Sequence, residues 1–173
     1  MKRIEKPAPS EYAPYADRYI SLLPDDGLVL KHMKENLKAT REFILSLPAE
    51  KLNFRYAEGK WTIKEILVHL SDDERIYTYR ALRFARHDLT ELPGFEQDDY
   101  ALHSNANARP VSKILSEFAT VRRATISLFN ELDDEALMRT GVADGTRVSV
   151  RALAYHIAGH ELRHVRIIKE RYL

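Results

Sequence analysis

Apolar residues recur at alternating spacings of three and four along four stretches of the chain, at about 28–47, 62–87, 110–132 and 149–171. That spacing places apolar side chains along one face of an α-helix, as in a helix that packs in a bundle. The pattern is clearest in the last stretch, at Val150, Leu153, Ile157, His160, His164 and Ile167. No alternating pattern is long enough for a strand of a sheet. The chain is therefore predicted to be all-α, a four-helix bundle.

Helix-starting residues stand where two of these stretches begin. Thr62 with Glu65 three residues later has the spacing of a capping box. Ser149 is a good N-cap for the last helix, and Asp144 with Gly145 just before it is a turn signal. These residues predict where the second and fourth helices begin.

Two stretches without helical periodicity frame the bundle. Residues 1–27 hold four of the seven prolines, which predicts an extended N-terminal arm. We expect the arm to pack its tyrosines, Tyr12, Tyr15 and Tyr19, on the outside of the domain, with one helical turn near 19–23. Residues 88–109 predict a long loop between the second and third helices, of a length that often marks a lid or a site wall. His103 in this loop is a candidate for substrate contact, with an ordinary surface histidine as the alternative. The predicted organisation is an arm at 1–27 and a single bundle domain at 28–173.

Composition narrows the possible partners. The 173 residues suffice for one domain with a sizeable core, and the net charge of +1 gives no sign of a nucleic-acid surface. No apolar run approaches the ~20 residues of a membrane span, and the N-terminus lacks the apolar core of a signal peptide. We therefore expect no nucleic acid, no membrane and a cytoplasmic location. The chain has no cysteine, so a metal site would rely on His, Asp or Glu.

Three histidines stand four residues apart on the last predicted helix, at His156, His160 and His164. They spread over about 80° of one face, and neutral imidazoles gathered on one face indicate a transition-metal site. His156 and His164 are about 12 Å apart along the axis, too far to share one ion. His160 and His164 lie on the apolar seam and His156 lies one position off it, which favours the first two as ligands and His156 as their neighbour. A pair of hydrogen-bonded core histidines is the alternative.

A further ligand must come from another helix, and His69 is the candidate because bundles commonly build metal sites from facing helices. Asp73, one turn beyond His69, is a candidate to orient a ligand or to move a proton, with a solvated helix carboxylate as the alternative. Residues 160–164 also match the H-E-x-x-H pattern of zinc metalloproteases, in which Glu161 would be the general base. No strand for peptide binding is predicted, which argues against a protease. Glu161 remains a second candidate for proton transfer.

Three segments resemble a known family: GKWTIKEILVHLSDDE around His69, PGFEQDDYALHSNANAR in the long loop, and HIAGHELRHVRII near the C-terminus. They are similar to the DinB superfamily, and within it to the DinB_2 and YfiT-like group of metal-dependent hydrolases, over nearly the whole chain from Leu28. The resemblance implies a four-helix bundle. It also implies that the family's metal-binding histidine triad falls on His69, His160 and His164. Relatives include thiol-dependent transferases and isomerases, so a metal site is implied more directly than a reaction.

Two classes of function remain open. In the first, an enzyme holds a divalent ion with three histidines and activates water for hydrolysis, or a low-molecular-weight thiol for transfer or isomerisation, of a small-molecule substrate. In the second, the protein is a non-catalytic metal-binding bundle in a stress response. A homodimer is expected. Zn²⁺ is the first expectation for the ion, and Ni²⁺, Mn²⁺ or Fe²⁺ also suit imidazole ligands.

Overall fold

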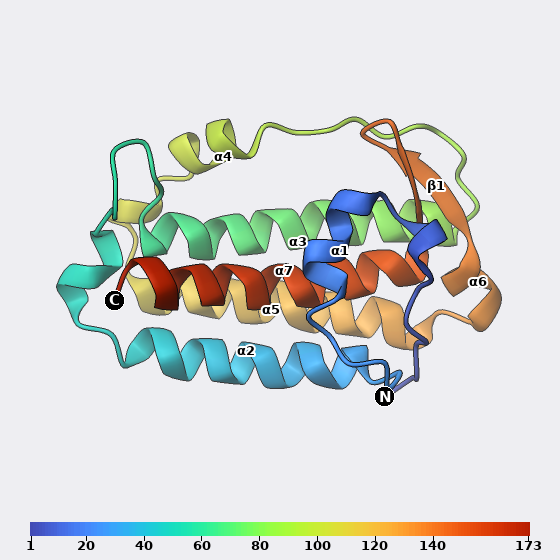
Figure 1. The fold of residues 1–173 in the computed structure, drawn as a ribbon, viewed down its shortest axis with the longest axis horizontal. Helices are drawn as coiled ribbons and strands as arrows, with labels where there is room; N and C mark the ends of the chain where they lie inside the picture. Colours follow the sequence, from blue (N-terminus) through green and yellow to red (C-terminus); the bar gives the residue numbers. More distant parts are fainter.

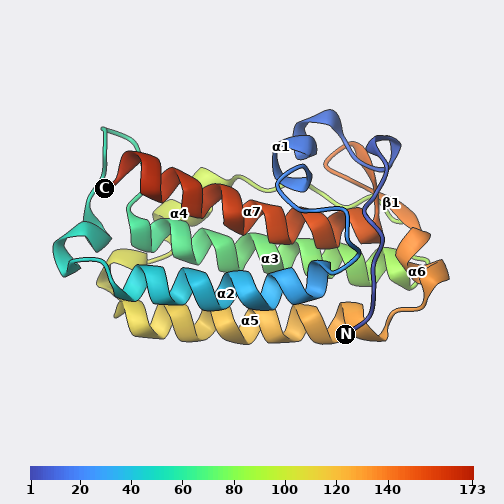
Figure 2. The ribbon, with the colours of Figure 1, turned by 60° about the horizontal axis from the view of Figure 1, so that its bottom comes forward.

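Four long helices form the body of the molecule in the computed structural model, which describes all residues from Met1 to Leu173. They are α2 (Val29–Leu45), α3 (Ile63–Ala85), α5 (Val111–Glu131) and α7 (Val150–Arg171). They lie side by side along the longest axis (Figure 1). α3 packs against α5 and α7, and α2 packs against the same two helices, so α2 and α3 occupy opposite corners (Figure 2). The predicted four-helix bundle is confirmed. None of its helices has the length and apolarity that crossing a membrane requires.

The predicted helix starts of α3 and α7 are confirmed by their caps. Thr62 Oγ1 accepts a hydrogen bond from the Glu65 backbone N–H at 3.1 Å, and Glu65 Oε2 accepts one from the Thr62 N–H at 2.7 Å. Ser149 Oγ accepts a hydrogen bond from the Ala152 N–H at 3.1 Å. These bonds satisfy backbone donors that the first helical turn leaves free.

The expectation that the chain has no sheet is wrong in one place. Strands β1 (Thr140–Ala143) and β2 (Thr146–Ser149) form a two-stranded antiparallel hairpin. Asp144 and Gly145 form its turn with φ of 52° and 66°, the left-handed values that a tight hairpin turn requires. Strands of four residues are too short to show a readable alternation, which is why the sequence did not predict them.

The connection at 88–109 is more structured than predicted. It contains helix α4 (Gln97–His103) and the 3₁₀ turn η4 (Ala106–Ala108). Only Ala101 of α4 is buried, so the helix has no apolar period to detect. The remaining short elements are η1 (Pro9–Glu11), η2 (Pro14–Ala16), α1 (Asp17–Ile20), η3 (Ala49–Asn53) and α6 (Asp134–Met138).

The N-terminal arm does not lie wholly on the outside. Its apolar residues belong to the larger buried cluster of the protein, namely Ile4, Tyr12, Ala16, Ile20 and Leu23. The expectation that the tyrosines pack on the outside of the domain is therefore wrong for Tyr12, which is 8% exposed and part of the core, whereas Tyr15 is 46% exposed. The predicted helical turn is α1, two residues earlier than expected. The boundary between residues 27 and 28 remains a prediction.

The core has two apolar parts. The larger has 25 buried residues, among them Met33, Phe84, Phe129 and Leu153. The smaller has 13, among them Ile44, Leu67, Phe118 and Ile168. Along each long helix, buried polar residues stand between the two parts: Thr40, Asp73, Glu74, Arg122, His160 and Glu161. The bundle is thus crossed near its middle by a polar layer.

Candidate metal centre

Three imidazoles from two helices converge beside this polar layer. His69 comes from α3, and His160 and His164 come from α7. One ring nitrogen from each lies within 4.8 Å of the others, and Nε2 of His69 is 3.1 Å from Nε2 of His160. Two nitrogens on one tetrahedral zinc ion stand about 3.3 Å apart, given Zn–N bonds of about 2.0–2.1 Å. The spacing suits ligands that share one ion.

A hydrogen bond between His69 and His160 would give the same distance, so the third imidazole bears on the choice. Nδ1 of His164 is buried and has no hydrogen-bond partner. A buried polar atom left in this state costs about 1–3 kcal/mol. A metal ion would satisfy it, and a set of imidazoles suits a divalent transition metal. The residues present therefore fit such an ion.

Burial sets the charge of these rings. It lowers the pKa of His69 to about 4 and that of His164 to about 3. It also holds the pKa of His160 well below its usual value, and the neighbouring imidazoles add to this effect. All three rings are therefore neutral at pH 7, with lone pairs that can bind a metal.

Asp73 lies behind His160 on the side away from His69. Its Oδ2 is 3.3 Å from Nδ1 of His160 and has no hydrogen bond of regular geometry. Burial raises the pKa of Asp73 to about 8. A divalent cation at His160 would oppose that shift, because nearby positive charge favours the carboxylate. A carboxylate at this distance can fix which ring nitrogen of His160 faces His69.

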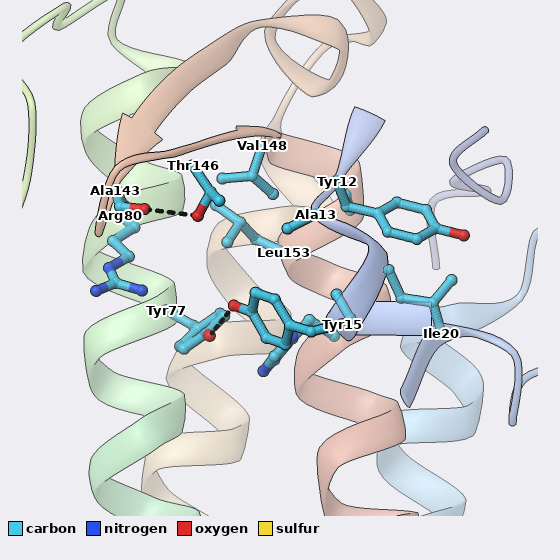
Figure 3. A pocket seen from close by; sticks show the side chains of 13 residues that line it. Tyr12, Ala13, Tyr15, Ile20, Tyr77, Arg80, Ala143, Thr146, Val148 and Leu153 are labelled. Carbon is cyan, nitrogen blue, oxygen red and sulfur yellow. Dashed lines mark hydrogen bonds between the residues drawn. The ribbon is translucent and has the colours of Figure 1, made fainter. Parts of the chain in front are cut away.

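His156 is buried beside Asp73 and not among the converging nitrogens. Its Nε2 is 3.9 Å from Asp73 Oδ2, and its ring stacks on Tyr77 with centroids 4.0 Å apart. It lines a small cavity of about 20 Å³, which has room for one water molecule. Figure 3 shows the hydroxyls of Tyr15 and Tyr77 meeting in this cavity, 3.3 Å apart.

Glu161 turns away from the imidazoles into the core. Its Oε1 accepts a hydrogen bond from Thr40 Oγ1 at 2.7 Å, and its Oε2 accepts one from Arg122 Nη1 at 2.7 Å. Burial raises the pKa of Glu161, although Arg122 opposes the shift. Both carboxylate oxygens are occupied, which counts against a role as general base.

A cleft of about 310 Å³ opens beside His164. Trp61 forms one wall, with its ring centroid 4.7 Å from that of His69 and 6.5 Å from that of His164. The full lining is Tyr56, Gly59, Lys60, Trp61, Ile66, Gln97, Asp98, His164, Ile167 and Tyr172. Gln97 and Asp98 belong to α4, so the connection expected to wall the site does contribute to this cleft. The volume is within the range of small-molecule sites.

His103 does not line this cleft. It borders a separate hollow with Asp72, Asp99, Tyr100 and Ser104, and its Nδ1 lies 2.8 Å from the backbone oxygen of Asp99. Its role in substrate contact stays a prediction without geometric support at the cleft.

Sequence reasoning missed Trp61 and Arg122. Arg122 is buried on α5 together with Phe118, Thr125 and Phe129. These residues are spaced by four, three and four along the helix, so a charged residue in line with buried positions was the available signal. Trp61 immediately precedes the N-cap of α3, where nothing in the periodicity distinguishes it.

Fold and site together define a class of protein, the four-helix bundles with a buried cluster of histidines on facing helices. Residues 32–168 match the DinB_2 model of the DinB superfamily. The chain belongs to the DinB superfamily.

Relatives and a solved structure agree with this assignment. The chain is 28% identical over 142 residues to a protein of Oceanobacillus iheyensis named "Putative metal-dependent hydrolase", covering 81% of each chain. It is 29% identical over 96 residues to a protein of the same description from Geobacillus thermodenitrificans, covering 54% of each. Its fold is similar to that of YfiT from Bacillus subtilis, described as "a probable metal-dependent hydrolase with an unusual four-helix bundle topology". The TM-score is 0.71 at 18% identity, covering 95% of this chain and 90% of the other.

Proposed function

We propose that this protein is a metal-dependent hydrolase that holds one divalent ion with His69, His160 and His164. The observation that carries the proposal is the convergence of three neutral imidazoles, one with an unpartnered buried nitrogen, beside a cleft of about 310 Å³. The names of the two relatives support it. Three protein ligands leave coordination positions open, as catalytic sites require.

When bound, a divalent ion supplies Lewis acidity and lowers the pKa of water toward ~7. The protein's own part is to hold the ligands still and neutral. Asp73 keeps the ring of His160 oriented from behind, and is our proposed partner for proton movement at the Nδ1 of His160. Glu161 has no free carboxylate oxygen, so we assign it to the framework.

The cleft walls indicate how a small-molecule substrate is held. Trp61 offers flat apolar surface next to His164, and it also shields His69 from water. Lys60 and Asp98 line the same cleft with opposite charges. An apolar or aromatic portion of the substrate would lie on the Trp61 ring, while Lys60 and Asp98 would meet its polar ends.

The remaining assignments are proposals of the same kind. Zn²⁺ is the proposed ion, and Ni²⁺, Mn²⁺ and Fe²⁺ are its competitors. We also propose a cytoplasmic homodimer.

The test is a substrate screen with a matched inactive variant. The purified protein, loaded in turn with Zn²⁺, Ni²⁺ and Mn²⁺, is assayed against a panel of esters and amides, and against electrophiles with low-molecular-weight thiols. Hydrolysis by the wild type that is lost in His160→Ala supports the proposal. Thiol transfer without hydrolysis would replace it with the transferase function. Metal binding without either activity would favour a non-catalytic bundle.

A further inference from the structure

Arg122 stands at the centre of the polar layer and is 1% exposed. Its Nε and Nη2 donate hydrogen bonds to the two carboxylate oxygens of Glu74, each at 2.9 Å. Its Nη1 donates to Glu161 at 2.7 Å and to the backbone oxygen of Met33 at 2.8 Å. Thr40 completes the group by donating to the other oxygen of Glu161.

This group joins all four long helices at one level. Arg122 belongs to α5, Glu74 to α3, Glu161 to α7, and Met33 and Thr40 to α2. The level lies between the two apolar parts of the core. Buried polar contacts, rather than interdigitated apolar side chains, therefore set the spacing of the helices there.

The same level carries the candidate metal centre. Glu74 follows Asp73 in α3, and Glu161 follows His160 in α7. Successive residues on a helix differ by about 100° in direction. Asp73 and His160 can thus meet at the α3–α7 contact while the next residue of each helix turns inward to Arg122. Holding Glu74 and Glu161 on one guanidinium fixes the two backbones that carry Asp73 and His160.

We infer that Arg122 is a remote positioning residue for the metal centre, which through Glu74 and Glu161 sets the distance and rotation of α3 against α7. The inference rests on the proposed metal site. Metal sites need their supporting residues held to about 0.5 Å, and a rigid bidentate fork suits that requirement. Stability alone does not account for the group, because a buried ion triad replaced by well-packed apolar residues is often as stable or more stable.

The test separates geometry from stability with three variants and one control. The triple variant Glu74→Leu/Arg122→Met/Glu161→Leu removes all three charges together and leaves none unpaired. Arg122→Lys keeps a buried cation but loses the bidentate fork. Arg122→Met leaves two carboxylates facing each other. The control is Arg123→Met, since Arg123 is exposed on the same helix.

The readouts are Co²⁺ affinity, the visible absorption spectrum of the Co²⁺-loaded protein, and thermal unfolding of the metal-free protein. We expect the triple variant to unfold at or above the wild-type temperature, yet to bind Co²⁺ about 10–100-fold more weakly with an altered spectrum. Arg122→Lys should fold, and its Co²⁺ affinity should lie between those of the wild type and the triple variant. This variant decides the question if the triple variant or Arg122→Met does not fold. The control should match the wild type.

Wild-type affinity and spectrum in the folded variants would overturn the inference and leave the metal site intact. A wild-type protein that binds no Co²⁺, Zn²⁺ or Ni²⁺ would instead overturn the proposed function, and the inference with it.

Discussion

Gly159 allows the N-terminal arm to touch α7, the helix that carries His160 and His164. It lies in α7 between His156 and His160, directly under α1. A Cβ added to Gly159 would stand 2.5 Å from the carbonyl carbon of Tyr19 and 3.0 Å from its Cα, and closer still to its carbonyl oxygen. All three atoms are backbone, so no side chain can rotate away.

Two effects of opposite sign decide the outcome of Gly159→Ala. Alanine favours the helix by about 1 kcal/mol over glycine. Against this, the arm must move by about 1 Å or more, and overpacking of a dense contact costs about 1–3 kcal/mol. Moving α1 also loosens Ile20, which is 1% exposed, and full burial of such a side chain contributes about 1.5–3 kcal/mol. The loss exceeds the gain, and we expect a net destabilisation of about 2 kcal/mol.

Urea and thermal unfolding measure this directly. A loss of about 2 kcal/mol lowers the unfolding temperature of a chain of this length by roughly 4–8 °C. The matched control is Ala124→Gly at an exposed position of α5, which reports the alanine–glycine difference without a contact. A Gly159→Ala protein that is more stable than the wild type by about 1 kcal/mol would show that the arm does not rest on α7.

Two further predictions concern the ionisable groups of the site. Asp73→Asn should fold and lower metal affinity by about 10–100-fold, because the amide orients the neighbouring imidazole less well, and wild-type affinity in a competition titration would contradict this. Metal-free protein should lose stability as the pH falls from 7 to 5. Burial lowers the pKa values of His69, His156 and His164 to about 4, 3 and 3 in the folded protein. Since a histidine of the unfolded chain has a pKa near 6.5, the unfolded chain takes up protons first as the pH falls. Each of the three histidines therefore lowers the free energy of unfolding by about 2 kcal/mol at pH 5. Asp73 acts in the opposite direction, because burial raises its pKa to about 8 and the folded protein takes up this proton first. It offsets roughly 3 kcal/mol over the same interval, which leaves a net loss of stability of roughly 3 kcal/mol. A urea midpoint at pH 5 that equals or exceeds the midpoint at pH 7 would refute the balance.

The long helices were predictable because their signals are local. Apolar spacing and caps such as Thr62 and Ser149 act within a few residues, so the sequence alone identified α2, α3, α5 and α7 to within about three residues. The choice of His160 and His164 followed from the same periodicity, and the structure brings a ring nitrogen of each close to one of His69. Their role as ligands stays a prediction.

Features that depend on distant contacts were not predictable in the same way. The burial of Tyr12 and Ile20 depends on the docking of α1 at Gly159, far along the chain. The inward position of Glu161 depends on its ion pair with Arg122. Burial of the Arg122 charge in turn requires the carboxylates of both Glu74 and Glu161. A motif such as H-E-x-x-H names a spacing and does not say which way each side chain turns.

The metal content of histidine variants tests the central claim most directly. Each purified protein is loaded with Zn²⁺, desalted, and its metal-to-protein ratio measured. We predict a ratio near one for the wild type and for His156→Ala, because His156 lies beside Asp73 and outside the group of three converging imidazoles. We predict a ratio near zero for His69→Ala, His160→Ala and His164→Ala, since two remaining imidazoles hold an ion weakly. If His156→Ala came out empty while His164→Ala stayed loaded, the ligands would lie one helical turn from the proposed positions and the account would be wrong.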